Sequence, residues 1–161
     1  MFSPDGKQVA FGWRSQPDEC ELRVVDLGDS QARVLYQAEK QEIGPADWSQ
    51  DGKSILALRR REPSHVEIVS IAAADGSLSV LKSFEGSSPN PWRLRFSPDG
   101  RFVGYDFAAD QKGNLDVFVL SVAGGQVTPL VQHPAQEQFL GWTPDGSSVL
   151  FLSDRSGSWG A

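Results

Sequence analysis

The sequence has 161 residues, of which 39% are hydrophobic, 22% charged and 10% aromatic. This size and composition suit one globular domain or part of one, and the apolar and aromatic content is too high for a disordered segment. Fifteen Lys and Arg against 21 Asp and Glu give a formal net charge of −6, which disfavours a nucleic-acid partner because surplus carboxylates repel phosphates.

Two further classes are disfavoured by simple counts. No apolar stretch approaches the roughly 20 residues that cross a bilayer, and the first residues lack the pattern of a signal peptide, so we expect no membrane insertion. Cys20 is the single cysteine, which excludes an intramolecular disulfide and any multi-cysteine metal site.

One short motif occurs four times along the chain. Its copies are Phe2-Ser3-Pro4-Asp5-Gly6, Trp48-Ser49-Gln50-Asp51-Gly52, Phe96-Ser97-Pro98-Asp99-Gly100 and Trp142-Thr143-Pro144-Asp145-Gly146. The four aspartates are 46, 48 and 46 residues apart, a period near 47. Ser or Thr, Pro, Asp and Gly in this order are typical of a tight turn in which Gly takes a positive φ. The motif therefore predicts four structural turns, which we call the Asp-Gly corners.

Strands are predicted on both sides of each corner. The aromatic residue ends one strand, and an apolar run begins the next at residues 9–11, 55–58, 103–105 and 149–152. Because these runs are apolar at consecutive positions, we expect both of their faces to be covered. Third strands share apolar first, third, fourth and sixth positions at Leu22–Leu27, Val66–Ile71 and Val117–Val122. A fourth, less apolar strand follows a Gly-bearing turn, and Pro129 within it indicates an outer sheet edge.

Four antiparallel strands in each unit of about 47 residues are typical of a β-propeller blade. We predict an all-β fold, a partial β-propeller of about 3.5 four-stranded antiparallel blades. Residues 1–161 would form one incomplete propeller domain with blade units near 1–38, 39–84, 85–133 and 134–161. We expect such a chain to be a fragment of a larger protein. The remaining blades of that propeller would then be among its binding partners.

The repeat resembles a known family. An aromatic residue, Ser/Thr-Pro-Asp-Gly, an apolar strand, a loop such as Ser153-Asp154-Arg155 and a strand such as Val24-Val25-Asp26-Leu27 resemble the TolB-like, WD-type propeller repeat. Similar blades occur in tricorn-like and prolyl-oligopeptidase-type peptidases and in many bacterial multidomain proteins. Gln50 departs from the motif, and Ser-Asp-Arg is present only in the last unit. The resemblance implies a propeller, and a periplasmic location if the parent is a TolB-type protein; localisation otherwise stays open.

Catalytic signatures are absent from the sequence. It contains no Gly-x-Ser-x-Gly, no His-Glu-x-x-His and no phosphate-binding glycine loop. Ser158 is better explained as a turn serine than as a nucleophile, and His65 and His133 as solvated loop histidines. We therefore expect no catalytic residue and no cofactor.

Two charged segments have alternative interpretations. Asp106, Asp110, Asn114 and Asp116 lack the spacing of a calcium loop, so we expect a polar hairpin loop and no metal site. The run 59–61 consists of three arginines, for which a solvated loop is favoured over contact with an anion or an acidic partner.

The geometry of a propeller suggests a binding rim. Loops after the second and the fourth strand of each blade share one side, and the Asp-Gly corners occupy the opposite side. Trp and Arg contribute most strongly to protein interfaces. The predicted partner-binding rim consists of Trp13, Arg14, Arg60, Trp92, Asp154, Arg155 and Trp159. For each Trp the alternative is packing between blades.

The leading functional hypothesis is a non-catalytic protein-interaction scaffold that binds a protein or peptide at this rim. One alternative is the substrate-gating propeller of a serine peptidase, and another is the sensor-like tail of a kinase or transcriptional regulator. The parent's other domains, its blade number, its ligand and its oligomeric state are left open by the sequence.

Overall fold

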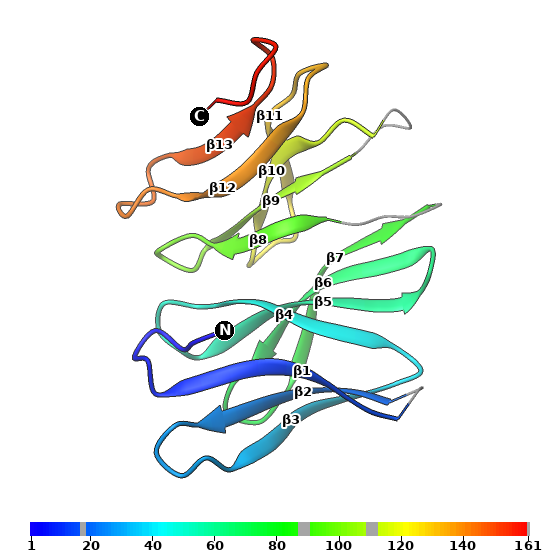
Figure 1. The fold of residues 1–161 in the computed structure, drawn as a ribbon, viewed down its shortest axis with the longest axis vertical. Helices are drawn as coiled ribbons and strands as arrows, with labels where there is room; N and C mark the ends of the chain where they lie inside the picture. Colours follow the sequence, from blue (N-terminus) through cyan, green and yellow to red (C-terminus); the bar gives the residue numbers. More distant parts are fainter. Residues whose placement is uncertain (17–18, 87–90, 109–112, 161) are drawn as a thin grey trace. The chain divides into compact units, whose positions relative to one another are not determined.

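The computed structural model describes residues 1–16, 19–86, 91–108 and 113–160. These residues form β-strands and turns, with no helix among them, which confirms the all-β prediction. The chain divides into two compact units, residues 1–88 and 89–161 (Figure 1).

The first unit contains two antiparallel sheets. The strands of the first are β1 (Gln8–Gln16), β2 (Glu19–Asp26) and β3 (Ala32–Glu39), and those of the second are β4 (Glu42–Trp48), β5 (Ser54–Glu62), β6 (His65–Ala72) and β7 (Leu78–Glu85). Strands pair in chain order, so β3 and β7 are sheet edges. Phe2 forms a bridge with Val9, and the Met1 amino group donates to the Ala10 carbonyl at 2.7 Å. The first residues thus lie where an innermost strand would pair with β1.

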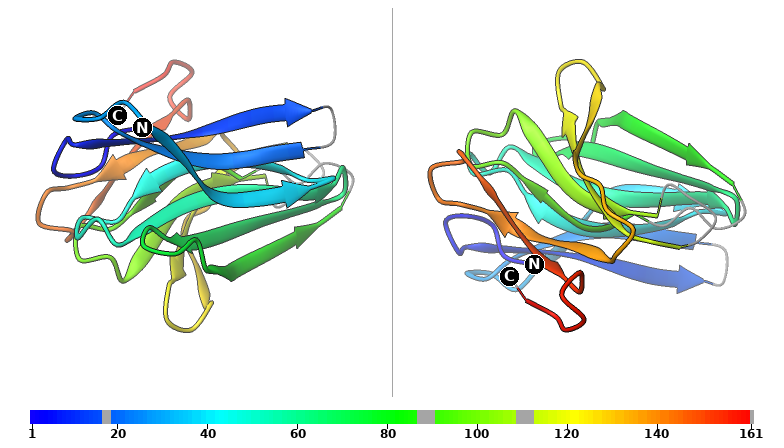
Figure 2. Two further views of the ribbon diagram at one scale, coloured as in Figure 1. Left: turned by 90° about the horizontal axis from the view of Figure 1, so that it is seen from below. Right: turned by 90° about the horizontal axis from the view of Figure 1, so that it is seen from above.

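The second unit repeats this organisation. One sheet contains β8 (Trp92–Phe96), β9 (Phe102–Phe107), β10 (Asp116–Ser121) and β11 (Val127–Val131), and the other contains β12 (Glu137–Trp142) and β13 (Val149–Ser153). Pro129 lies on the edge strand β11, as predicted. In both views of Figure 2 the yellow hairpin of β10 and β11 extends away from the other strands of this unit.

The four Asp-Gly corners have the same hydrogen bonds. At the first corner the Ser3 hydroxyl donates to Asp5 Oδ1 at 2.6 Å and accepts from the Gln8 amide at 2.9 Å, while the Lys7 amide donates to the same Asp5 oxygen at 3.1 Å. The second corner forms the equivalent bonds although Gln50 replaces proline. The corner glycines have φ between 69° and 71°, which favours glycine. The corners are therefore structural turns, as predicted.

Packing in the first unit joins its two sheets. Ala10, Leu22 and Val24 of the first sheet belong to the same buried cluster as Ile55 and Ile71 of the second. Strand β5 is covered on both faces, because consecutive residues 55–57 are all fully buried. The apolar run therefore predicts this strand correctly.

The second unit has an aromatic core. Phe139 of β12 is fully buried and packs on Gly104 of β9, and the rings of Tyr105 and Phe118 stack with centroids 5.6 Å apart. The expectation of burial on both faces fails for β13, since Leu150 is half exposed. The face of β13 that carries Leu150 is therefore only partly covered.

The hydrogen-bond register corrects one part of the repeat alignment. Leu22 pairs with Gly12, and Ile68, rather than Val66, pairs with Leu58. Gly12 and Leu58 are equivalent positions, because each lies seven residues after its corner aspartate. The residue equivalent to Leu22 is therefore Ile68, two residues later than the repeat pattern predicts. A shift of two residues keeps every side chain on the same face, so the apolar pattern fits both registers.

Candidate functional site: the loop ends of the sheets

Each sheet has an end opposite its Asp-Gly corner, which we call the loop end. Three tryptophans of the predicted rim lie at the loop ends of their own sheets: Trp13 late in β1, Trp92 at the start of β8 and Trp159 in the hairpin after β13. Their exposed fractions are 50%, 55% and 51%. These three indoles are thus presented to solvent, whereas the corner residue Trp48 is buried.

Two rim arginines of the first unit meet at one carboxylate. Arg14 Nη2 donates to Glu42 Oε1 at 3.0 Å, and Arg60 Nε lies 3.8 Å from Glu42 Oε2. Beside them, the guanidinium of Arg23 lies 5.4 Å from the centre of the Trp13 ring. The structure therefore brings Trp13, Arg14 and Arg60 to the loop ends of two adjacent sheets.

The sequence analysis did not predict a buried carboxylate in the first unit, but Glu67 is one. Glu67 of β6 accepts from Arg59 Nε at 2.7 Å, and Arg59 Nη1 donates to the Tyr36 hydroxyl of β3 at 3.0 Å. Burial alone would lower the pKa of Arg59, but the bonds to Glu67 and Tyr36 outweigh it and raise that pKa. A polar bridge thus joins the two sheets of the first unit.

This bridge corrects two sequence interpretations. Arg59 is not in a solvated loop, because its side chain is only 12% exposed within β5. His65 is not a free loop histidine either, since its Nε2 lies 3.2 Å from Glu67 Oε1. Strand alternation sends Arg60 to the other face, as expected.

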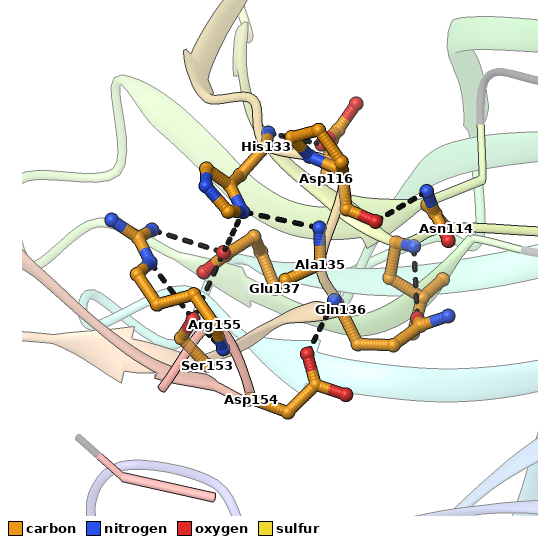
Figure 3. Close-up of polar contacts among 11 residues, drawn as sticks. Asn114, Asp116, His133, Ala135, Gln136, Glu137, Ser153, Asp154 and Arg155 are labelled. Atoms are coloured by element: carbon orange, nitrogen blue, oxygen red, sulfur yellow. Dashed lines mark hydrogen bonds and ion pairs between the residues drawn. The ribbon is translucent and has the colours of Figure 1, made fainter. Parts of the chain in front are cut away.

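The second unit has a comparable cluster around Glu137. Figure 3 shows His133, Ser153 and Arg155 converging on this fully buried carboxylate. The Ser153 hydroxyl donates to Glu137 Oε1 at 3.0 Å and Arg155 Nη2 donates to the same oxygen at 2.9 Å, while His133 Nδ1 stands 3.8 Å away. The Ser-Asp-Arg segment therefore joins its hairpin to β12, whereas His133 is an exposed loop histidine, as predicted.

Neighbouring loops are held by further polar contacts. Asp154 Oδ1 accepts from the Gln136 amide at 2.9 Å, Asn114 Nδ2 donates to the Pro134 carbonyl at 2.7 Å, and the His133 amide donates to Asp116 Oδ1 at 3.2 Å (Figure 3). Of the four residues weighed as a calcium site, Asp110 lies outside the described residues. The described parts of the chain contain no group of three or more His, Cys, Asp or Glu side chains arranged to hold a metal ion.

Asp106 is the least expected charged residue of this unit. It is almost fully buried in β9, its Oδ2 accepts from the Phe139 amide of β12 at 3.0 Å, and its Oδ1 has no hydrogen-bond partner among the described residues. Burial raises the pKa of this carboxyl to about 6, although the nearby positive charge of Arg93 opposes the shift. Asp106 thus joins the two sheets of the unit through one of its oxygens.

The residues considered as catalytic candidates, Ser158, His65 and His133, form no catalytic arrangement within the described residues. The carbonyl of Ser158 accepts from the Ser156 hydroxyl at 3.2 Å, and no histidine contacts the Ser158 side chain among the described residues. His133 Nδ1 accepts from the Ala135 amide at 3.1 Å, so this nitrogen is engaged within its own loop. The described part of the chain also offers no membrane-crossing helix.

The buried carboxylates that sequence reasoning missed carried a weak signal. Glu21, Glu67, Asp106 and Glu137 each interrupt or adjoin an apolar strand segment. A charged side chain inside such a segment must be paired when it is buried. Interpreting these positions as buried, paired charges would have predicted the polar clusters around Glu67 and Glu137.

No family model matches this chain. Two curated proteins resemble it at the sequence level: an uncharacterised peptidase, YuxL, of Bacillus subtilis (strain 168), 24% identical over 159 residues, and the Tol-Pal system protein TolB of Bordetella pertussis, 28% identical over 138 residues. The alignments cover 95% and 85% of this chain but 21% and 30% of those proteins. The chain thus spans less than a third of the length of either relative.

Solved structures show the same fold. TolB from Acinetobacter baumannii superposes with a TM-score of 0.71 at 24% identity, over 96% of this chain and 38% of its own length. A protein assigned as TolB from Agrobacterium tumefaciens gives 0.73 at 21% identity, over 94% and 52%. A prolyl endopeptidase gives 0.70 at 17% identity, over 97% and 24%. The all-β sheets of this chain are therefore those of a partial β-propeller.

Proposed function

We propose, from the TolB-like β-propeller fold of this chain, that it is a non-catalytic protein-interaction segment that binds a protein or peptide at the loop ends of its sheets. The contact residues in this proposal are those of the predicted rim: Trp13, Arg14, Arg60, Trp92, Asp154, Arg155 and Trp159. The four sheets belong, in the same proposal, to one incomplete propeller domain.

One observation carries the proposal. Each of the three rim tryptophans leaves about half of its surface in water, at the loop end of its own sheet. An exposed indole leaves apolar surface in contact with water, and Trp is enriched among the residues that dominate binding energy. A surface that buries these indoles against a partner would recover this hydrophobic free energy.

The experiment selects ligands from a random-peptide phage library on the immobilised chain and measures the affinity of the enriched peptides for single variants. Trp13→Ala, Trp92→Ala or Trp159→Ala should weaken binding by about 30-fold at the tryptophan that a peptide contacts, as for a 2 kcal/mol interface residue. Leu27→Ala is the matched control, because Leu27 is also 50% exposed but lies at the corner end of the first sheet. Peptides that depend on Leu27 and on none of the tryptophans would contradict the proposal.

Non-catalytic behaviour has its own test. The purified chain should hydrolyse no peptide substrate in an assay with blocked chromogenic peptides. Turnover that persists through successive purification steps and is abolished by Ser158→Ala would overturn this part of the proposal.

A second candidate function is the gating propeller of a serine peptidase, supported by the likeness to the Bacillus peptidase along 95% of this chain. Sequence adjoining this chain in its gene distinguishes the two: a hydrolase segment with Gly-x-Ser-x-Gly favours the peptidase. A kinase or winged-helix domain there would favour the regulatory alternative.

A further inference from the structure

We propose that the loop end of β8 binds an acidic peptide segment, with a peptide carboxylate on the guanidinium of Arg93 and a neighbouring apolar side chain on the indole of Trp92. This inference rests on the proposed interaction function and names the class of partner.

The first supporting observation is the backbone of Arg93. Its φ is +50°, in the left-handed region, and the pairing of β8 with β9 is irregular between Trp92 and Arg95. An L-residue with a side chain pays about 1 kcal/mol for this conformation, and such strain concentrates at functional sites. The irregularity leaves Arg93 exposed on an edge strand.

The second observation is the state of the guanidinium. Arg23, Arg59 and Arg155 each donate to a buried glutamate. Within the described parts of the chain, by contrast, no hydrogen bond or ion pair holds the Arg93 side chain. The charge of Arg93 acts on the buried carboxylate of Asp106, but no described group accepts a hydrogen bond from the guanidinium. Its N–H donors can therefore bond an external acceptor, and a carboxylate accepts two of them in parallel.

The third observation is the neighbouring indole. Trp92 is the most exposed tryptophan of the three at the loop ends, and it precedes Arg93 directly. An exposed indole next in sequence to an exposed guanidinium that no described group hydrogen-bonds matches a peptide that carries an apolar side chain next to an acidic one.

Charge decides which anion fits. The net charge of −6 repels an extended polyanion such as a nucleic acid. A short peptide carries few charges and so gains from the local cation with little repulsion from the rest of the chain. The complementary occupant is therefore a peptide carboxylate.

The test uses the full chain and two terminally blocked peptides, Gly-Leu-Glu-Leu-Gly and its counterpart with Gln in place of Glu. Binding is followed through the indole N–H signals of the tryptophans in ¹⁵N NMR spectra, assigned with single Trp→Phe variants. The Glu peptide should shift the Trp92 signal and bind about tenfold more tightly than the Gln peptide, as for one charge-assisted hydrogen-bonded pair.

Three variants separate charge from backbone. Arg93→Gly and Arg93→Asn both tolerate a positive φ and remove the cation, so each should lose the tenfold preference for Glu while the chain keeps its far-UV circular dichroism spectrum. Arg93→Lys keeps the charge and should retain part of the preference. Arg33→Asn, at another exposed arginine, is the control and should leave the preference intact.

The outcomes are distinguishable. Equal binding of the two peptides, an unchanged preference in Arg93→Gly, or displacement of the peptide by equimolar inorganic phosphate would each overturn the inference. If the peptides enriched on the immobilised chain shift only the signals of Trp13 or Trp159, the interaction proposal stands and this inference is wrong. If no enriched peptide shifts any of the three signals, both fail.

Discussion

The ring of Phe139 in β12 lies directly on the backbone of Gly104 in β9. A Cβ on Gly104 would overlap Phe139 Cζ, closer than two non-bonded carbon atoms can approach. Absence of a side chain at position 104 is therefore what lets the two sheets of the second unit close on each other.

Gly104→Ala should accordingly destabilise the protein. We expect a loss of about 1–3 kcal/mol in the free energy of unfolding, because Phe139 must move within a packed core. Urea unfolding followed by circular dichroism measures it. Gly141→Ala is the matched control, since a Cβ there meets nothing within 4 Å, and its effect should stay within about 0.5 kcal/mol.

Asp106 predicts a pH dependence of stability. Burial raises its pKa to about 6 in the folded protein, above the ordinary value of 3.8, so folding favours the protonated form. The contribution is fully present below about pH 4 and is lost as the pH rises through 6. The free energy of unfolding should fall by up to roughly 3 kcal/mol between pH 4 and pH 8 from this group.

Asp106→Asn should remove this dependence, because the amide does not titrate in the range. Urea unfolding at pH 5 and pH 8 makes the comparison, with the exposed Asp29→Asn as control. A pH dependence that is unchanged in Asp106→Asn would show that another group is responsible.

The corner aspartates predict the opposite dependence in acid. The Ser97 hydroxyl and the Arg101 amide donate to Asp99, which lowers the pKa of this carboxyl to about 2. Because the folded pKa lies below 3.8, the stabilisation is present above about pH 4 and is lost as the pH falls through 2. Asp99→Asn should be less stable than the wild type at pH 5, and the difference should shrink at pH 2. Thermal unfolding at both pH values would reveal a constant difference if this account is wrong.

The bridge from Tyr36 through Arg59 to Glu67 predicts graded losses. Arg59→Met leaves Glu67 buried without its main partner and should cost about 3–5 kcal/mol. Tyr36→Phe removes one hydrogen bond and should cost about 1 kcal/mol. Arg60→Met, whose ion pair with Glu42 is long and partly solvated, should change stability by less than about 1 kcal/mol. Equal losses for Arg59→Met and Arg60→Met in urea unfolding would refute the importance of the buried bridge.

Much of the fold was predictable because its strongest signals are local. Corner bonds join residues two to five positions apart, as between Ser49 and Asp51 or Ser54, so the four copies of the motif indicate four equal turns even where Gln50 replaces proline. Likewise, Pro129 places β11 at an edge because proline lacks the amide that a neighbouring strand would need.

The candidate site was predictable only in part. Trp13, Trp92 and Trp159 lie at loop ends, as propeller geometry implied, but which tryptophans are exposed depends on what covers them. Arg59 and Arg60 are adjacent and chemically alike, yet one is buried between two sheets and the other meets Glu42 near solvent.

The sequence by itself determined the repeat, its corners and the order of strands within each sheet, because these depend on contacts between near neighbours and on the alternation of side chains along a strand. Only the tertiary structure decided that Ile68, rather than Val66, pairs with Leu58. It alone also decided the burial of Glu67, Asp106 and Glu137 and the contact of Phe139 with Gly104. Alternation tells which face a side chain occupies, whereas its partner on that face comes from another strand or sheet, often dozens of residues away, and is set by how those elements pack.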